Sequence, residues 1–334
     1  MRTDTSYLGF RLPHPFMAGA SPLGHHLDTV RRLEDAGCAA VVLHSLFEEQ
    51  ITAAQDGRIR RMDPADSLFA GTLAAFPAPS RYPLGPDAYA EHIRRAKEAI
   101  QIPLIGSLNG TSKESWLKFA RMIEQAGADA LELNLYQVFT DGRVSAEAIE
   151  AQLAGIVREV KRLIKIPIAV KITPFFTSFA NMARQLDAAG ADALVLFNRF
   201  YQNDLDIKTM SVAPRVELST SSELLLRLHW LAILHGRVRP ALAVSGGIAT
   251  SEDGVKAILS GADAVQLVSA LLRHGTQYVK TIRDGLEHWM EEHGFASLDE
   301  MRGLASFEDV TDPEALERAN YIRTLQSWGE ESWP

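Results

Sequence analysis

The sequence predicts an α/β protein with a (β/α)8 barrel of the TIM type, and three observations support this fold class. One repeat unit occurs four times along the chain, eight apolar runs have the length of strands, and segments of helical periodicity separate them. Runs that are apolar on both faces are typical of a parallel sheet covered by helices, and eight such units close into a barrel. A doubly wound open sheet is the alternative, but it usually has fewer strands, and nothing in the sequence marks a switch point.

The repeat unit joins the end of a helix to the start of a strand. In each copy a helical stretch ends at a glycine, a residue suited to the left-handed backbone at a helix C-terminus, and a small residue or Asp and an apolar run follow. The copies are residues 35–45, 125–135, 187–198 and 259–269, with the glycines Gly37, Gly127, Gly190 and Gly261.

Four further apolar runs complete the set of eight strands. Helical periodicity lies between the strands, as in residues 117–126 and 156–164. We therefore expect one barrel domain over residues 1–295. The four runs are residues 16–21, 103–110, 167–174 and 241–248.

Two connections and the C-terminal end depart from the regular pattern. Residues 46–86 follow the second predicted strand and residues 199–221 follow the sixth, and loops of this length in a compact domain usually carry function. Residues 296–334 form an acidic appendix that we expect to belong to the same domain. In it, Asp312 and Pro313 predict the start of a helix that runs to about Gln326 and serves packing or an oligomer contact.

Composition and charge exclude several classes of protein. The 334 residues contain one cysteine, Cys38, which rules out an intrachain disulfide framework and fits a reducing compartment. No stretch approaches the roughly 20 apolar residues of a membrane span, and the N-terminus lacks a signal-peptide core, so we expect a cytoplasmic protein without membrane contact. The net charge of −8 comes from the C-terminal region. From Asp284 onward, Asp284 included, the chain has 13 acidic and 3 basic residues. The near-neutral remainder, despite a short basic run at 58–61, predicts no nucleic-acid partner.

Several cofactor and metal motifs are absent from the chain. It contains no GxGxxG, Walker A, CxxC or HExxH motif. His25 and His26 follow the first predicted strand and would line a site there, but no third ligand accompanies them. We therefore predict no metal.

Polar residues stand at the C-terminal ends of the predicted strands, the face on which barrel enzymes place their chemistry. Lys171 lies inside the apolar run IAVKI, where a buried ammonium costs several kcal/mol unless it has a partner. We interpret it as a cation at the barrel mouth beside an electron-rich ligand, and a lysine whose amine reaches solvent at the rim is the alternative. The other residues of this kind are Asn109, Asn134, Asn198 and Ser245.

The turns after the seventh and eighth predicted strands indicate a phosphate site. Gly246 and Gly247 precede a predicted helix and would offer bare backbone N–H groups at its start, and Val268 and Ser269 would offer more. Barrel enzymes often bind phosphate with the loops after strands 7 and 8.

Together these motifs resemble the FMN-dependent dihydroorotate dehydrogenase family, in particular its soluble class 1 branch. The similarity runs from about Leu8 to about Phe295, and the order and spacing of the motifs make it more specific than any single one. The motifs are the opening LGFRLPHPFMAGASPLG, ELNL (132–135), VKITPFF (170–176), the Asn198 segment and SGGIATSEDGVKAILSGADAVQLVSALL (245–272).

The resemblance implies FMN as the cofactor, lying across the barrel mouth. Lys171 would stand near the N1–C2=O edge of the flavin, where a fixed ammonium stabilises the negative charge left by a hydride arriving at N5. Asn134 and Asn198 would bind flavin or substrate. The implied cofactor-binding residues are Ala20, Ser21, Ser45, Asn109, Asn134, Lys171, Asn198, Ser245, Gly246, Gly247, Val268 and Ser269.

The segment that would face the substrate departs from the family pattern. Where class 1 members read Asn-x-Ser-Cys-Pro-Asn, Gln137 takes the place of the catalytic Cys base and Phe139 the place of a substrate-binding Asn. An amide cannot accept a proton at neutral pH. His44 stands in place of a family lysine, and residues 217–221 replace a glycine-rich stretch. The candidate replacement bases are His44, Tyr136, His25 and His26.

We therefore predict an FMN-dependent oxidoreductase acting on a CH–CH bond, similar to the enzymes that convert dihydroorotate to orotate in pyrimidine biosynthesis but with a different small-molecule substrate. Without iron–sulfur cysteines or a dinucleotide motif, its electron partner would be a diffusible acceptor or a separate subunit. Three alternatives stay open: a flavin-binding partner without catalysis, a lyase that uses Lys171 as a Schiff-base amine, and a tRNA-reducing flavoenzyme, which the acidic balance disfavours. The resemblance also implies a homodimer.

Overall fold

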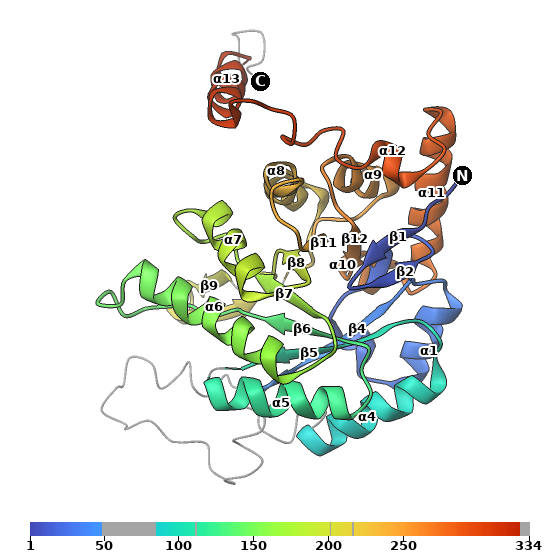
Figure 1. Ribbon diagram of the computed structural model, residues 1–334, viewed down its shortest axis with the longest axis vertical. Helices are drawn as coiled ribbons and strands as arrows, with labels where there is room; N and C mark the ends of the chain where they lie inside the picture. The colour runs from blue at the N-terminus through green and yellow to red at the C-terminus, as the bar shows by residue number, and fades with distance from the viewer. Residues whose placement is uncertain (49–84, 111, 201, 216, 328–334) are drawn as a thin grey trace.

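The computed structural model describes residues 1–48, 85–110, 112–200, 202–215 and 217–327. Its centre is a closed barrel of parallel strands in the order β11-β12-β3-β4-β5-β6-β7-β8 (Figure 1). This barrel confirms the predicted fold class, and its strands coincide with the eight predicted apolar runs. They are β3 (Phe16–Ala18), β4 (Val41–Phe47), β5 (Leu104–Asn109), β6 (Ala130–Asn134), β7 (Ile168–Ile172), β8 (Ala193–Leu196), β11 (Ala241–Ser245) and β12 (Ala264–Leu267).

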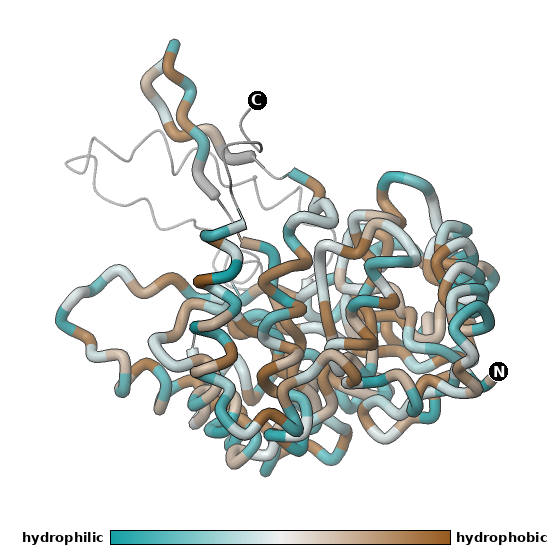
Figure 2. Tube along the Cα trace, turned by 90° about the horizontal axis from the view of Figure 1, so that it is seen from above, coloured by the Kyte–Doolittle hydropathy of each residue, from teal (hydrophilic) through white to brown (hydrophobic). Residues whose placement is uncertain are grey.

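Helices cover the outside of the barrel (Figure 1). Ser112, Ser145 and Ser178 cap three of them by accepting a backbone hydrogen bond, and Thr250 and Asp253 form a capping box. Hydrophobic and hydrophilic segments alternate along the chain (Figure 2), as expected for helices with one face on the barrel. The helices are α1 (Leu27–Asp35), α4 (Pro86–Ala99), α5 (Lys113–Gln125), α6 (Ala146–Leu163), α7 (Phe179–Ala189), α8 (Leu224–Leu234), α9 (Ser251–Leu259), α10 (Ser269–His274) and α11 (Tyr278–Glu292), with 3-10 turns η1 (Pro22–Gly24) and η3 (Ser221–Glu223).

The four repeat glycines adopt the left-handed conformation that the sequence predicts. Gly37, Gly127, Gly190 and Gly261 have φ values of 89°, 96°, 98° and 108°. They follow α1, α5, α7 and α9 and turn the chain into β4, β6, β8 and β12. The repeat is therefore the helix-to-strand corner of the barrel.

Inside the barrel, small side chains alternate with residues that face the helices. Alanines at the starts of the strands form one buried cluster in the interior. A hairpin that the sequence did not reveal, β1 (Thr5–Tyr7) and β2 (Phe10–Leu12), packs Tyr7, Leu8 and Leu12 against this cluster. Because the hairpin packs at the N-terminal ends of the strands, the C-terminal ends are left for a ligand site.

The structure describes one of the two long connections in its central part and leaves most of the other outside the described residues. Most of the connection after β4 falls on residues 49–84, outside the described residues, and so does the basic run at 58–61. The connection after β8 is a hairpin in its central part, because β9 (Gln202–Asp206) pairs antiparallel with β10 (Ser211–Arg215). The sequence analysis did not predict this hairpin.

The C-terminal appendix contains two helices, α12 (Leu298–Met301) and α13 (Pro313–Gln326). The second confirms the predicted helix, and the Asp312 carboxylate accepts a hydrogen bond of 2.9 Å from the Ala315 N–H. The Phe307 N–H donates to the Ala232 carbonyl at 2.8 Å and joins the appendix to α8. α13 itself lies apart from the barrel (Figure 1), and none of its residues is buried.

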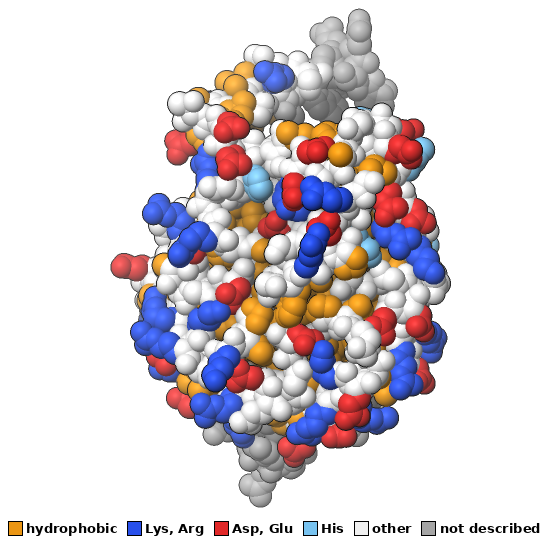
Figure 3. Space-filling view, turned by 45° about the vertical axis from the view of Figure 1, so that its right-hand side comes forward, with side chains coloured by type: hydrophobic (Ala, Val, Ile, Leu, Met, Phe, Trp, Pro, Cys, Tyr) orange, Lys and Arg blue, Asp and Glu red, His pale blue; other side chains and the backbone are white. Residues whose placement is uncertain are grey.

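The surface carries charges of both signs. Figure 3 shows basic and acidic side chains interspersed over one face of the molecule. Among the described residues, no helix is long and apolar enough to cross a membrane.

Candidate active site

A cavity of about 350 Å³ lies at the C-terminal ends of β4, β6, β7 and β8 and at the turn after β3, and we call it the mouth cavity. Apart from Pro22 and Phe47, every residue that lines it is one that the sequence indicated for the site. This is the position at which barrel enzymes bind their ligands. The lining residues are Ala20, Ser21, Pro22, His25, His44, Ser45, Phe47, Asn134, Lys171 and Asn198.

Lys171 is held in the cavity floor by two partners that the sequence analysis missed. Its ammonium donates a hydrogen bond of 3.1 Å to Gln266 Oε1 and lies 3.4 Å from Glu132 Oε1. Gln266 Nε2 in turn donates to Glu132 Oε2 at 2.5 Å. The Lys171 side chain is 6% exposed, so the alternative of a lysine reaching solvent at the rim is wrong.

The sequence contains a signal for one of these partners. Glu132 stands two residues before Asn134 on β6, so the two side chains point to the same side of the strand. Gln266 gives no comparable signal. It reaches Glu132 only because β12, far along the chain, closes the barrel.

Three histidines meet at one wall of the mouth cavity. The His44 ring lies 4.2 Å from the His25 ring and 6.1 Å from the His92 ring, between centroids. Burial, and then the neighbouring His25, lowers the pKa of His44 from 6.5 to about 3. His44 is therefore uncharged at neutral pH and cannot replace the positive charge of a lysine.

Among the residues that line the cavity, two buried polar atoms lack hydrogen-bond partners within the described chain. They are Asn134 Oδ1 and His44 Nδ1. An unpaired buried polar atom is destabilising, so each favours a ligand that can bond to it. Ser45, by contrast, is bonded at 2.8 Å to Ser107.

The turns after β11 and β12 differ from the bare N–H groups that the sequence suggests. The Gly247 N–H donates to Ser219 Oγ at 3.1 Å, and the Ser219 hydroxyl donates to Ser269 Oγ at 2.9 Å. The N–H groups of Ala249 and Thr250 donate to the Asp253 carboxylate. The expectation of free donors at these three N–H groups is therefore wrong, and hydroxyl groups line the turn instead.

A buried arginine behind this turn was not predicted. Arg227 of α8 donates from Nε to the Ser245 carbonyl at 2.5 Å and from Nη1 to the Glu223 carbonyl at 2.6 Å. A Cβ atom added to Gly246 would lie 2.9 Å from Arg227 Nη2, so the guanidinium packs directly on the glycine turn. Burial lowers its pKa to about 10, so the group stays positively charged at neutral pH.

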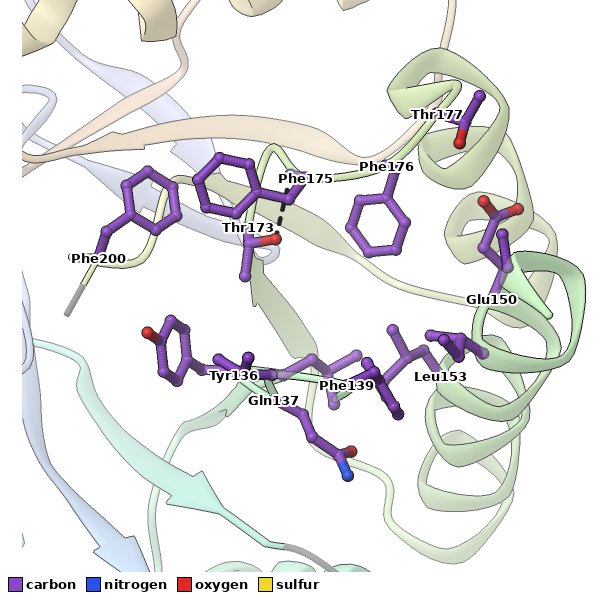
Figure 4. Close-up of a pocket in the computed structure, with 14 residues that line it drawn as sticks. Tyr136, Gln137, Phe139, Glu150, Leu153, Thr173, Phe175, Phe176, Thr177 and Phe200 are labelled. Atoms are coloured by element: carbon purple, nitrogen blue, oxygen red, sulfur yellow. Dashed lines mark hydrogen bonds between the residues drawn. The ribbon is translucent and has the colours of Figure 1, made fainter. Parts of the chain in front are cut away.

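The other predicted site residues lie elsewhere. Asn109 is buried at the end of β5 but is not among the residues that line the mouth cavity. Tyr136, Gln137 and Phe139 line a second pocket of about 460 Å³ next to it, which we call the aromatic pocket (Figure 4). They are not among the residues that line the mouth cavity with Lys171.

An eight-stranded parallel barrel with a buried cation and unpaired hydrogen-bonding groups at its mouth defines an enzyme of the TIM-barrel class that acts on small molecules. The sequence profile of dihydroorotate dehydrogenase matches residues 82–290. The chain belongs to the dihydroorotate dehydrogenase family, as the resemblance predicts, and is an oxidoreductase that acts on a CH–CH group.

Individual relatives include dehydrogenases of two kinds. The chain is 26% identical over 339 aligned residues to the NAD-dependent dihydropyrimidine dehydrogenase subunit PreA of Escherichia coli (strain K12), covering 95% of this chain and 80% of that protein. It is 30% identical over 313 residues to the catalytic subunit of dihydroorotate dehydrogenase B (NAD(+)) of Thermoplasma acidophilum, covering 90% and 98%. It is 27% identical over 330 residues to the chloroplastic dihydropyrimidine dehydrogenase (NADP(+)) of Arabidopsis thaliana, covering 91% and 77%.

Proposed function

We propose that the protein is an FMN-dependent oxidoreductase that binds the flavin at the mouth cavity and acts on a C–C bond of a small substrate other than dihydroorotate. The observation that carries the proposal is the buried Lys171 ammonium, fixed by Glu132 and Gln266 beside a cavity with unpaired polar atoms. When bound, FMN would supply hydride transfer, which leaves negative charge on its N1–C2=O edge.

The residues around the mouth cavity fit a flavin ring. Lys171 offers a fixed cation to that edge, and its position cannot drift because two side chains hold it. Asn134 Oδ1 is a buried, unpaired acceptor that a ring N–H group could bond, and Asn198 also lines the cavity. Ala20 and Ser21 are small enough to let a flat ring approach the turn after β3.

The turns after β11 and β12 fit a phosphate through hydroxyl groups and a cation. The Ser269 hydroxyl accepts hydrogen bonds from the Ser219 N–H and the Ser219 hydroxyl, so it can turn its own hydrogen toward an anion. Arg227 adds a positive charge behind Gly246. Gly246 and Gly247 keep the turn free of side chains. We propose this turn as the phosphate end of the FMN site.

The replacement of the family base points to a changed substrate. His44 is a weak base because its pKa is lowered to about 3, and efficient general bases have pKa values near the working pH. We propose that neutral His44 hydrogen-bonds the substrate through its unpaired Nδ1 atom. Tyr136 lies in the aromatic pocket, and Gln137 has no basic group.

The Schiff-base interpretation loses support. Imine formation needs a neutral amine with a free lone pair, whereas Lys171 donates to Gln266 and pairs with the Glu132 carboxylate. Both contacts stabilise the ammonium form.

We further propose that the protein is a homodimer that passes electrons to a diffusible acceptor or a separate subunit. Tyr321, Ile322 and Leu325 on α13 are exposed apolar residues of a helix in which no residue is buried. Sedimentation should give about twice the chain mass of 36.8 kDa, and a mass near 36.8 kDa would contradict the dimer.

The function is tested by the absorption spectrum of the purified protein, before and after addition of FMN, followed by anaerobic addition of dihydroorotate and of dihydrouracil. The proposal predicts an oxidised-flavin spectrum that dihydroorotate does not bleach. Bleaching by dihydroorotate would contradict the changed substrate. Absence of flavin binding, even with added FMN, would contradict the function itself.

A further inference from the structure

The aromatic pocket begins where the mouth cavity ends. Asn134, Lys171 and Asn198 line the cavity, and Tyr136, Thr173 and Phe200, each two residues further along the chain, line the pocket. The three chain segments leave the barrel side by side, because the Leu135 N–H donates to the Lys171 carbonyl at 2.8 Å and the Asn198 N–H donates to the Ile172 carbonyl at 3.0 Å. Two residues span at most about 7 Å, so a ligand in the cavity would reach the pocket.

Aromatic rings dominate the pocket walls. In Figure 4 the Tyr136 ring on one side faces Phe175 and Phe200 on the other, and the Gln137 amide points away from them. The Phe175 and Phe200 rings are 4.5 Å apart between centroids. Phe139 and Phe176 add two further rings. Rings arranged in this way favour a flat partner, because offset stacking and edge contacts add to the burial of area.

The described lining of the pocket offers no positive charge to an anion. It contains no Lys, Arg or His, and its one carboxylate is Glu150, which accepts a hydrogen bond of 2.9 Å from Gln185. The nearest cation of the mouth cavity, Lys171, is paired with Glu132. A carboxylate bound here would face Glu150 without a counter-charge, which is unfavourable in a partly buried site.

The pocket also exposes apolar surface that a ligand would cover. Phe175 is 74% exposed and Val138 is 68% exposed, although both lie at the pocket wall. A volume of about 460 Å³ is within the range of small-molecule sites.

We infer that the aromatic pocket binds an uncharged, flat, apolar ring, and that this ring is the non-reacting part of the substrate whose C–C bond lies in the mouth cavity. The second half of this inference rests on the proposed function. The first half concerns the pocket alone.

The test is isothermal titration of the full chain, with and without FMN, using three probes that share a conjugated C=C bond. They are trans-cinnamamide (uncharged, with a ring), crotonamide (uncharged, without a ring) and cinnamate (a carboxylate with a ring). Burial of a ring predicts that cinnamamide binds about 10- to 100-fold more tightly than crotonamide. Cinnamate should bind at least about tenfold more weakly than cinnamamide.

Phe175→Ala is the matched variant, since a residue that is 74% exposed contributes little to folding. It should weaken cinnamamide binding about fivefold or more and leave crotonamide unchanged, because it removes a ring and no polar group. Tyr321→Ala, which removes a 55% exposed ring from α13, is the control and should change neither.

The outcomes separate the two proposals. Equal affinities for cinnamamide and crotonamide in a protein that binds FMN would overturn the inference and leave the proposed function standing. A ring preference that Phe175→Ala abolishes, in a protein that never binds FMN, would support the pocket assignment and overturn the function. Tighter binding of cinnamate than of cinnamamide would overturn the assignment of an uncharged ligand.

Discussion

The mouth cavity and the aromatic pocket are neighbours on the same strands, yet they are built in opposite ways. The cavity uses polar side chains at strand ends, among them Lys171 and Asn134, which are at least nine-tenths buried. The pocket uses rings on the loops that follow, and Phe175 there is largely exposed. Barrel closure fixes the first set, whereas loops can change without disturbing the barrel. We propose that the mouth cavity is the cofactor site and that the aromatic pocket determines which substrate binds.

The largest effect that we expect comes from Lys171→Met in the mouth cavity. It leaves the buried Glu132 carboxylate without its cation, which typically costs about 3–5 kcal/mol of unfolding free energy. Urea unfolding measures this loss. Adding Glu132→Gln to the same chain should recover more than half of it.

The control for this variant is Lys113→Met, whose ion pair with Glu159 is exposed at 57% and 41%. It should cost less than about 1 kcal/mol. Equal losses in the two lysine variants would show that the mouth cavity is no more tightly built than the surface.

A second comparison concerns the cost of replacing glycine by alanine at Gly247, in the turn after β11, and at Gly155. Gly247 has φ of 84°, and an added Cβ would lie 2.5 Å from the Leu224 nitrogen, so we expect a loss of about 2–3 kcal/mol. Gly155 on α6, the helix behind the aromatic pocket, has nothing within 4 Å of an added Cβ. Gly155→Ala should stabilise the chain by about 0.5–1 kcal/mol in thermal unfolding. A stable Gly247→Ala variant would remove the argument for a fixed turn.

Acidification should lower the free energy of unfolding through His44, which lines the mouth cavity. Its pKa is 6.5 in the unfolded chain and about 3 in the folded one, so below pH 6.5 the unfolded chain binds more protons. The stability contributed by neutral His44 is complete above pH 6.5 and is lost as the pH falls toward 3, by about 2 kcal/mol between pH 7 and pH 5. Urea unfolding at the two pH values should show that His44→Asn abolishes this part of the loss.

His288→Asn is the control, because the His288 side chain is 70% exposed on α11. It should change the free energy of unfolding by less than about 1 kcal/mol, because the contact of His288 with Glu292 is exposed. If His44→Asn keeps the full acid sensitivity, His44 is not held neutral by burial.

The smallest effect is expected for Gln137→Ala. The amide is exposed and points away from the rings, and it has no basic group, so turnover should change by less than about twofold. Asn134→Ala in the mouth cavity should lower turnover by at least about tenfold, since it removes a buried hydrogen-bonding group. Steady-state rates with a substrate found by the spectral assay would measure both, and a tenfold loss in Gln137→Ala would return that residue to the active site.

Much of the fold could be predicted because each barrel corner leaves a local signal. Gly37, Gly127, Gly190 and Gly261 mark those corners, and the apolar runs mark the strands. The N-terminal hairpin and the β9–β10 hairpin were missed, because short strands without strong alternation look like loops.

The sequence predicted those site residues that carry a signal in their own local sequence. Lys171 was found because a cation in an apolar strand is conspicuous, whereas Gln266 and Ser219 were not. Their roles depend on contacts with residues 95 and 28 positions away. Gln137 and Phe139 line the aromatic pocket and not the mouth cavity, and the sequence contains no local signal that separates the two.

The most direct test of the account is a titration of the purified protein with FMN, in which the quenching of flavin fluorescence reports binding. The titration compares the wild type with the Gly247→Ala and Gly155→Ala variants. The account predicts saturable binding of one FMN per chain, at least about tenfold weaker in Gly247→Ala and unchanged in Gly155→Ala. Absence of saturable binding, or equal binding by all three proteins, would contradict a flavin site at the barrel mouth.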